Sequence, residues 1–99
     1  MEVKESYEFW KRTRFGKASY ANDRRRLNRK LKKAGYQFIC KPLYDGYQWT
    51  FSEFSGDIVI HWGSYGSRYG HFESMGMPWD GDDCTECTAN EIIEWLKDE

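Results

Sequence analysis

The centre of the chain, residues 36–62, reads YQFICKPLYDGYQWTFSEFSGDIVIHW, in which apolar and aromatic residues alternate with polar ones between turn signals. Alternation with a period of two is typical of strands that bury one face. The dipeptide Asp45-Gly46 favours a two-residue type I′ turn, which places Pro42 opposite Trp49. Because proline has no N–H to donate, we expect the first strand at an edge of the sheet.

A second hairpin is predicted at Ser55-Gly56, which places Phe51 opposite Ile60. Both turns put the large apolar residues on one side of the sheet, an agreement that a register slip of one residue would destroy. This side collects Tyr36, Phe38, Cys40, Tyr44, Tyr47, Trp49, Phe51, Ile58, Ile60 and Trp62. We expect helices to cover it, so these residues are predicted to form the core rather than a surface on which bases stack.

Three helices are predicted on either side of this meander. They cover residues 6–14, residues 19–34 with Ser19 as the cap and Gly35 just past the end, and a C-terminal segment that starts at the capping box TANE (88–91). A fourth strand is expected over residues 70–75. The sequence therefore predicts one α+β domain, residues 1–99, with two N-terminal helices, an antiparallel β-meander of about four strands and a C-terminal helix.

The composition excludes several classes of protein. Aromatic residues make up 18% of the chain, more apolar surface than a disordered segment carries. No apolar run approaches the roughly 18 residues of a membrane span, and the start MEVKE lacks the apolar region of a secretory signal. We therefore expect a cytoplasmic protein, with its three cysteines reduced.

The net charge of −1 hides two strongly charged halves. Residues 1–48 carry 13 Lys and Arg against 5 Asp and Glu, whereas residues 49–99 carry 2 against 11. In the predicted helix 19–34, one face carries five cations and no acid: Arg25, Arg29, Lys32 and Lys33, together with Arg26. Such a face suits phosphates or an acidic partner, or it is simply a solvated outer face. Opposite charges on one domain can also pair between copies, so monomer and homodimer both stay open.

Two further regions are predicted to contact a protein partner. The loop GSYGSRY (63–69) combines flexible Gly and Ser with residues that anchor interfaces, namely Tyr65, Arg68 and Tyr69. The alternative for this loop is that its tyrosines pack back onto the sheet. An acidic region follows and contains Asp80, Asp82, Asp83 and Glu86. It can imitate a row of phosphates, or serve solubility alone.

Zinc binding by the cysteines, or catalysis by the histidines, is a weaker interpretation of the sequence. Cys84 and Cys87 form a CxxC pair, half of a zinc tetrahedron, whose other ligands would have to come from Cys40, His61 or His71. His61 and His71 are also the natural acid–base pair for a ribonuclease. The sequence has no second pair of residues at the spacing of metal ligands, and no spacing that would assemble a Ser-His-Asp or Cys-His triad. We therefore expect no catalytic residue, no metal and no cofactor.

Four short stretches resemble small phage and prophage proteins of unassigned function: GDIVIH (56–61), GSYGS (63–67), PWDGDD (78–83) and TANE (88–91). The resemblance covers about the last 45 residues and names no catalytic residue. It implies a class of short accessory proteins, among them inhibitors of host enzymes and of bacterial defence, including anti-CRISPR proteins.

The sequence thus predicts a non-catalytic binding protein of phage or mobile-element type that inhibits a bacterial nucleic-acid-handling or defence complex. The acidic region and the Tyr/Arg loop would contact the protein target, without a membrane. Direct nucleic-acid binding by the basic helix is the alternative, and a His-dependent ribonuclease is the third hypothesis.

Overall fold

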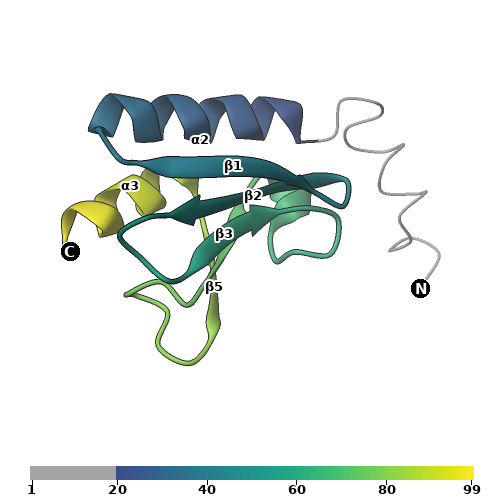
Figure 1. Cartoon of the computed structure of the whole chain (residues 1–99). Coiled ribbons are helices and arrows are strands. Elements are labelled where there is room, and N and C mark those ends of the chain that lie inside the picture. Colours follow the sequence, from purple (N-terminus) through teal and green to yellow (C-terminus); the bar gives the residue numbers. More distant parts are fainter. Residues whose placement is uncertain (1–19) are drawn as a thin grey trace.

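The computed structural model describes residues 20–99. Its elements are α2 (Ala21–Ala34), β1 (Phe38–Leu43), β2 (Gly46–Phe51), β3 (Asp57–Ile60), the 3-10 helix η4 (Ser67–Tyr69), β4 (Phe72–Met75), β5 (Cys84–Cys87) and α3 (Ala89–Lys97). The strands form one antiparallel sheet in the order β1-β2-β3-β4-β5 (Figure 1). The α+β class is confirmed, but the meander has five strands rather than four. The predicted helix over residues 6–14 lies outside the described residues.

Helix α2 ends where the sequence predicts. Gly35 follows it with φ 88° and donates its backbone N–H to the carbonyl of Lys32, which is the left-handed conformation that glycine adopts without strain. At the other end Tyr20 occupies the N-cap position, and the predicted cap Ser19 lies outside the described residues. The buried stripe of the helix runs through Leu27 and Leu31.

The first hairpin differs from its prediction by two residues. Pro42 lies opposite Tyr47, not Trp49, and Leu43 pairs with Gly46, so the turn is formed by Tyr44 and Asp45. The cause lies in the next strand: a Cβ on residue 46 would lie 1.8 Å from the carbonyl oxygen of Ile60. Gly46 is therefore needed inside β2, where β3 approaches closely, and not in the turn.

The second hairpin also has a different register. Trp49 pairs with Ile58 and Tyr47 with Ile60, because the connection spans residues 52–56 rather than two residues. Both shifts are by an even number of residues. Since strand side chains alternate with a period of two, the predicted apolar side is retained.

Two aromatic residues of that predicted side are exposed. Tyr44 lies in the turn with φ 55°, and Trp62 follows the end of β3 at Ile60. Neither continues the alternation of a strand, so both leave the core, with 85% and 39% of their surface exposed. Their assignment to the core was wrong.

The fifth strand is formed by the CxxC segment. β5 pairs with β4, with Cys87 opposite Phe72 and Cys84 opposite Met75. Because residues three apart in a strand point to opposite faces, only Cys87 joins the core. The four residues of this strand, CTEC, show no clear alternation of apolar and polar positions, which is why the sequence did not reveal it.

The chain between β4 and β5 is ordered by a buried polar network. Asp80 accepts hydrogen bonds from the Ser74 hydroxyl at 2.8 Å and from the Met77 N–H at 2.9 Å. The indole N–H of Trp79 donates to the same Ser74 hydroxyl at 2.8 Å, and the Trp79 ring packs on Trp95 of α3 with centroids 5.4 Å apart.

Helix α3 begins at the predicted capping box. The Thr88 hydroxyl accepts from the N–H of Glu91, and the Glu91 carboxylate accepts from the N–H of Thr88. Ile92 and Leu96 then enter the same core cluster as Leu27 and Leu31 of α2.

Both helices thus contribute to one core on the apolar side of the sheet. Figure 1 shows α2 running along the sheet beside β1, with α3 next to it. Trp49 is fully buried at this junction, and its indole N–H donates to Asn28 of α2 at 2.7 Å. Within residues 20–99, no helix has the length and apolar character to span a membrane.

Candidate functional site

Exposed aromatic side chains gather at one end of the sheet. Among the described residues, the exposed large apolar side chains are Ile39, Tyr44, Trp62, Tyr65, Tyr69 and Met75. Four of these six lie in the β1–β2 turn and in the connection from β3 to β4. We call Tyr44, Trp62, Tyr65 and Tyr69 the aromatic end. Two surface hollows, of about 560 and 480 Å³, adjoin there because Trp62 and Gly63 line both.

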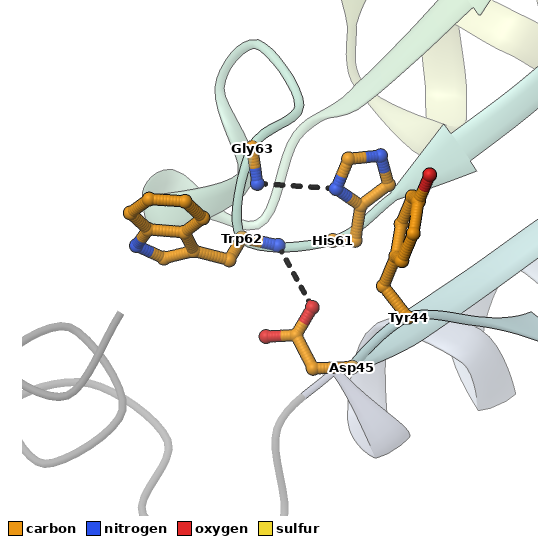
Figure 2. A pocket seen from close by; sticks show the side chains of 5 residues that line it. All are labelled: Tyr44, Asp45, His61, Trp62 and Gly63. Carbon is orange, nitrogen blue, oxygen red and sulfur yellow. Dashed lines mark hydrogen bonds between the residues drawn. The ribbon is translucent and has the colours of Figure 1, made fainter. Parts of the chain in front are cut away.

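The first hollow is framed by the turn and by the residues after β3 (Figure 2). The Tyr44 ring stands edge-on to the His61 ring, with centroids 5.2 Å apart and planes at 74°. Asp45 accepts a hydrogen bond from the N–H of Trp62 at 3.1 Å, and Nδ1 of His61 accepts one from the N–H of Gly63 at 3.1 Å. Because Nδ1 is an acceptor, the neutral ring carries its proton on Nε2.

The second hollow lies over the loop that carries Tyr65 and Tyr69. The loop backbone is held by short polar side chains: the Ser64 hydroxyl accepts from the His61 N–H at 3.0 Å, and the Ser67 hydroxyl donates to the Trp62 carbonyl at 3.4 Å. From the sheet, Glu73 of β4 accepts from the N–H of Tyr65 at 2.9 Å. These bonds fix the loop so that its tyrosines stand out from the surface.

A second acidic side chain supports the same loop from β5. Glu86 lies against Gly66, where a Cβ would meet its carboxylate at 2.5 Å, and Gly66 has φ 78°. Glu86 also contacts Nδ1 of His71 at 2.7 Å. Glu86, predicted to contact a partner, is thus exposed but already engaged within the fold.

The predicted basic face is only partly a free surface. Arg25, Arg29, Lys32 and Lys33 are exposed. Arg26 is half-buried: its guanidinium pairs with Asp23 at 3.1 Å, donates to the Gly70 carbonyl at 3.0 Å and lies 5.8 Å from the centre of the Phe72 ring. Arg26 therefore connects α2 to the end of the loop and does not belong with the other four.

Of the acidic region, Glu86 lies against the loop, whereas the three aspartates have other surroundings. Asp80 is buried in the network with Ser74 and Met77, so its predicted contact with a partner is wrong. Asp82 and Asp83 are exposed in the connection between β4 and β5, whereas the loop belongs to the connection between β3 and β4. Arg68, in η4 between the two loop tyrosines, is exposed beside them.

The cysteine pair lacks the geometry of a metal site. Cys84 and Cys87 point to opposite faces of β5, and burial raises the pKa of the Cys87 thiol to about 12. Two thiols on opposite faces of a strand do not converge on one metal ion, which a zinc tetrahedron requires of its ligands. Residues 20–99 contain no group of three or more His, Cys, Asp or Glu side chains that could hold a metal ion.

The two histidines are not placed as a pair. His61 lines the hollow beside Tyr44, whereas His71 lines a different one with residues of α2 and α3. Each already has a polar partner, Gly63 and Glu86 respectively. Neither of these hollows is lined by both imidazoles.

No family model matches the chain, and neither curated proteins nor solved structures show a significant similarity to it. The candidate site therefore rests on geometry. The sequence identified Tyr65, Arg68 and Tyr69, but it assigned Tyr44 and Trp62 to the core and considered His61 only for catalysis or zinc binding. The signal for Tyr44 was its position beside the Asp45-Gly46 turn, which an error of two residues in register concealed.

Proposed function

We propose that this chain is a non-catalytic binding protein that contacts a protein partner through the aromatic end. The observation that carries the proposal is the concentration of four exposed aromatic side chains on two adjoining hollows. Tyrosine and tryptophan supply large contact areas at low cost in side-chain entropy, and they are enriched among the residues that dominate binding energy.

The hydrogen bonds around the loop support the same proposal. Tyr65 follows Ser64, whose hydroxyl is bonded to His61, and its own N–H is held by Glu73. At the loop's far end, Arg26 of α2 holds Gly70, the residue after Tyr69. A surface that is already ordered loses less conformational entropy on binding, so the aromatic end is suited to contact without rearrangement.

The class of partner is inferred from the resemblance of the C-terminal stretches to phage and prophage accessory proteins. On that basis we propose that the partner is a bacterial nucleic-acid-handling or defence complex in the host cytoplasm, and that binding inhibits it. Placement of the histidines in separate hollows supports a mode of action without catalysis.

A capture experiment with matched variants tests this proposal. The full chain is immobilised and exposed to bacterial lysate treated with nuclease, alongside Tyr65→Ala/Tyr69→Ala and Ile39→Ala variants. Ile39 is an equally exposed apolar residue, but it lies on β1 outside the aromatic end. We expect one protein to be retained by the native chain and by Ile39→Ala and lost from the tyrosine variant. Equal retention by all three, or retention only without nuclease, contradicts the proposal.

A further inference from the structure

The outer face of α2 carries a stripe of four exposed cations. Arg29 lies four residues after Arg25, and Lys32 and Lys33 lie three and four residues after Arg29, which places all four on one side of the helix. Among the described residues no carboxylate forms an ion pair with any of them, in contrast to Arg26, which pairs with Asp23. Arg25 has a hydrogen bond to the side chain of Asn22, which is neutral and does not compensate the charge of the guanidinium.

Two neighbouring arginines of the same helix are engaged within the fold. The Arg24 guanidinium lies 5.1 Å from the centre of the Tyr47 ring, and Arg26 is bonded to Asp23 and Gly70. These two face the sheet and the loop. The four exposed cations, which we call the cationic stripe, face away from both.

A groove between α2 and α3 extends the positive surface sideways. It encloses about 580 Å³ and brings Lys30 and Lys33 of α2 together with Lys97 of α3, against a single carboxylate, Glu94. Lys33 belongs to both the groove and the stripe. The groove therefore adds two ammonium groups beside the stripe and leaves one acid at its border.

We propose that the cationic stripe binds the phosphate backbone of a nucleic acid, with one strand lying along α2 and the groove lysines beside it. From Arg25 to Lys33 the helix rises about 12 Å, at about 1.5 Å per residue. Duplex DNA carries one negative charge per about 1.7 Å of its axis, a dense row of charge that four cations within this length are suited to contact. Two of the four are guanidinium groups, which match phosphate oxygens in pairs. This site lies outside the aromatic end and goes beyond the proposed protein contact.

The concentration of four cations on one helical face favours a phosphate backbone, which carries a negative charge at every nucleotide, over a protein surface, where carboxylates are interspersed with other groups. It also gives a quantitative expectation. If four phosphates are neutralised, the logarithm of affinity for duplex DNA falls with a slope of about −3.6 against the logarithm of salt concentration. Affinity then drops about 100-fold between about 50 and 200 mM salt.

Fluorescence anisotropy of a short labelled DNA duplex, with single-stranded DNA and duplex RNA as parallel probes, tests the proposal. The native full chain is compared with Arg29→Gln/Lys33→Gln, which removes half of the stripe; glutamine keeps the helix propensity of the residues it replaces. Lys41→Gln is the control, since Lys41 is an exposed cation on β1 outside the stripe. Glu94→Gln removes the one acid of the groove.

We expect the double variant to bind at least tenfold more weakly at low salt, with a slope of about half the native value, and Lys41→Gln to bind as the native chain does. Glu94→Gln should bind more tightly. A thermal unfolding midpoint close to the native one shows that the double variant is folded. The three probes distinguish which nucleic acid supplies the phosphates.

Several results overturn the proposal. One is the absence of binding to all three probes at low salt, and another is an equal loss in Lys41→Gln. If polyglutamate displaces the duplex at equal charge concentration, the stripe recognises carboxylates and its partner is an acidic protein. If the chain sediments as a dimer at low salt and binds none of the probes, while the double variant sediments as a monomer, the stripe contacts a second copy instead.

Discussion

The indole N–H of Trp49, in the middle of the sheet, donates a 2.7 Å hydrogen bond to the side-chain oxygen of Asn28 on α2. Trp49 is fully buried, so no water can replace this acceptor. Cys40, on the neighbouring strand, has a raised thiol pKa because of burial at the same junction. This buried polar contact, together with the Arg24 guanidinium on the Tyr47 ring, joins the helix that carries the cationic stripe to the sheet that carries the aromatic end.

Asn28→Ala should lower the free energy of unfolding by about 1–3 kcal/mol, because it leaves a buried donor without a partner. Asn22→Ala is the matched control, since Asn22 is an exposed asparagine of the same helix. Urea denaturation measures both. Equal effects of the two substitutions would show that the Trp49 contact is not the source of the loss.

Gly46→Ala should destabilise the sheet by about 1–3 kcal/mol, the usual cost of overpacking a close contact. The new methyl group would lie 1.8 Å from the Ile60 carbonyl oxygen, so β2 and β3 must separate. Gly63→Ala is the control, because its Cβ would be 3.5 Å from the nearest described atom, in His61. A Gly46→Ala protein as stable as the Gly63→Ala protein would contradict the close approach of β3 to Gly46.

Ser74→Ala should cost about 1–3 kcal/mol, because the hydroxyl connects Trp79 to Asp80 inside the core and its loss leaves both groups short of a partner. Ser55→Ala, at an exposed serine in the β2–β3 connection, should have an effect near zero. Thermal unfolding of the two variants gives the comparison. No difference between them would mean that water satisfies Asp80 and Trp79 without Ser74.

The raised thiol pKa of Cys87 predicts that the folded protein loses stability in alkaline solution. Its thiol ionises near pH 9.0 in the unfolded chain, whereas burial raises its pKa to about 12 in the folded chain. The contribution is complete below pH 9.0 and is lost as the pH rises towards 12, by up to about 1.4 kcal/mol per pH unit.

Urea denaturation between these pH values, on the native chain and on Cys87→Ala, measures the effect. The variant is expected to start less stable, because it loses a buried side chain, but to lose less on going to high pH. Parallel curves for the two proteins would show that Cys87 does not titrate in this way.

Much of the fold follows from the periodicity of the sequence. The side of the sheet that faces the core is correct even though both registers are wrong, because errors of two and four residues preserve the alternation. The capping box at Thr88 and the end of α2 at Gly35 are local signals, and both are confirmed. The position of Gly46 depends on Ile60, a contact between strands that no local pattern contains.

The candidate site was also predictable only in part, because some of its residues are placed by tertiary contacts that no local pattern contains. Tyr65 and Tyr69 lie in a loop whose composition indicates recognition. Tyr44 joins them through the turn geometry. Asp80 is buried by its bond to Ser74, and the guanidinium of Arg26 is engaged by Gly70; both bonds are tertiary contacts. A charged residue in the sequence does not show whether its charge is used within the fold.

Site-specific photo-crosslinking tests most directly the claim that the aromatic end is the contact surface. Benzoylphenylalanine replaces Tyr65 in one protein and Ile39 in another; both side chains are exposed, and only the first belongs to the aromatic end. After irradiation in nuclease-treated bacterial lysate, we expect one crosslinked protein from position 65 that excess native chain competes away, and none from position 39. The same crosslinks from both positions, or none from position 65 while capture persists, would contradict the claim.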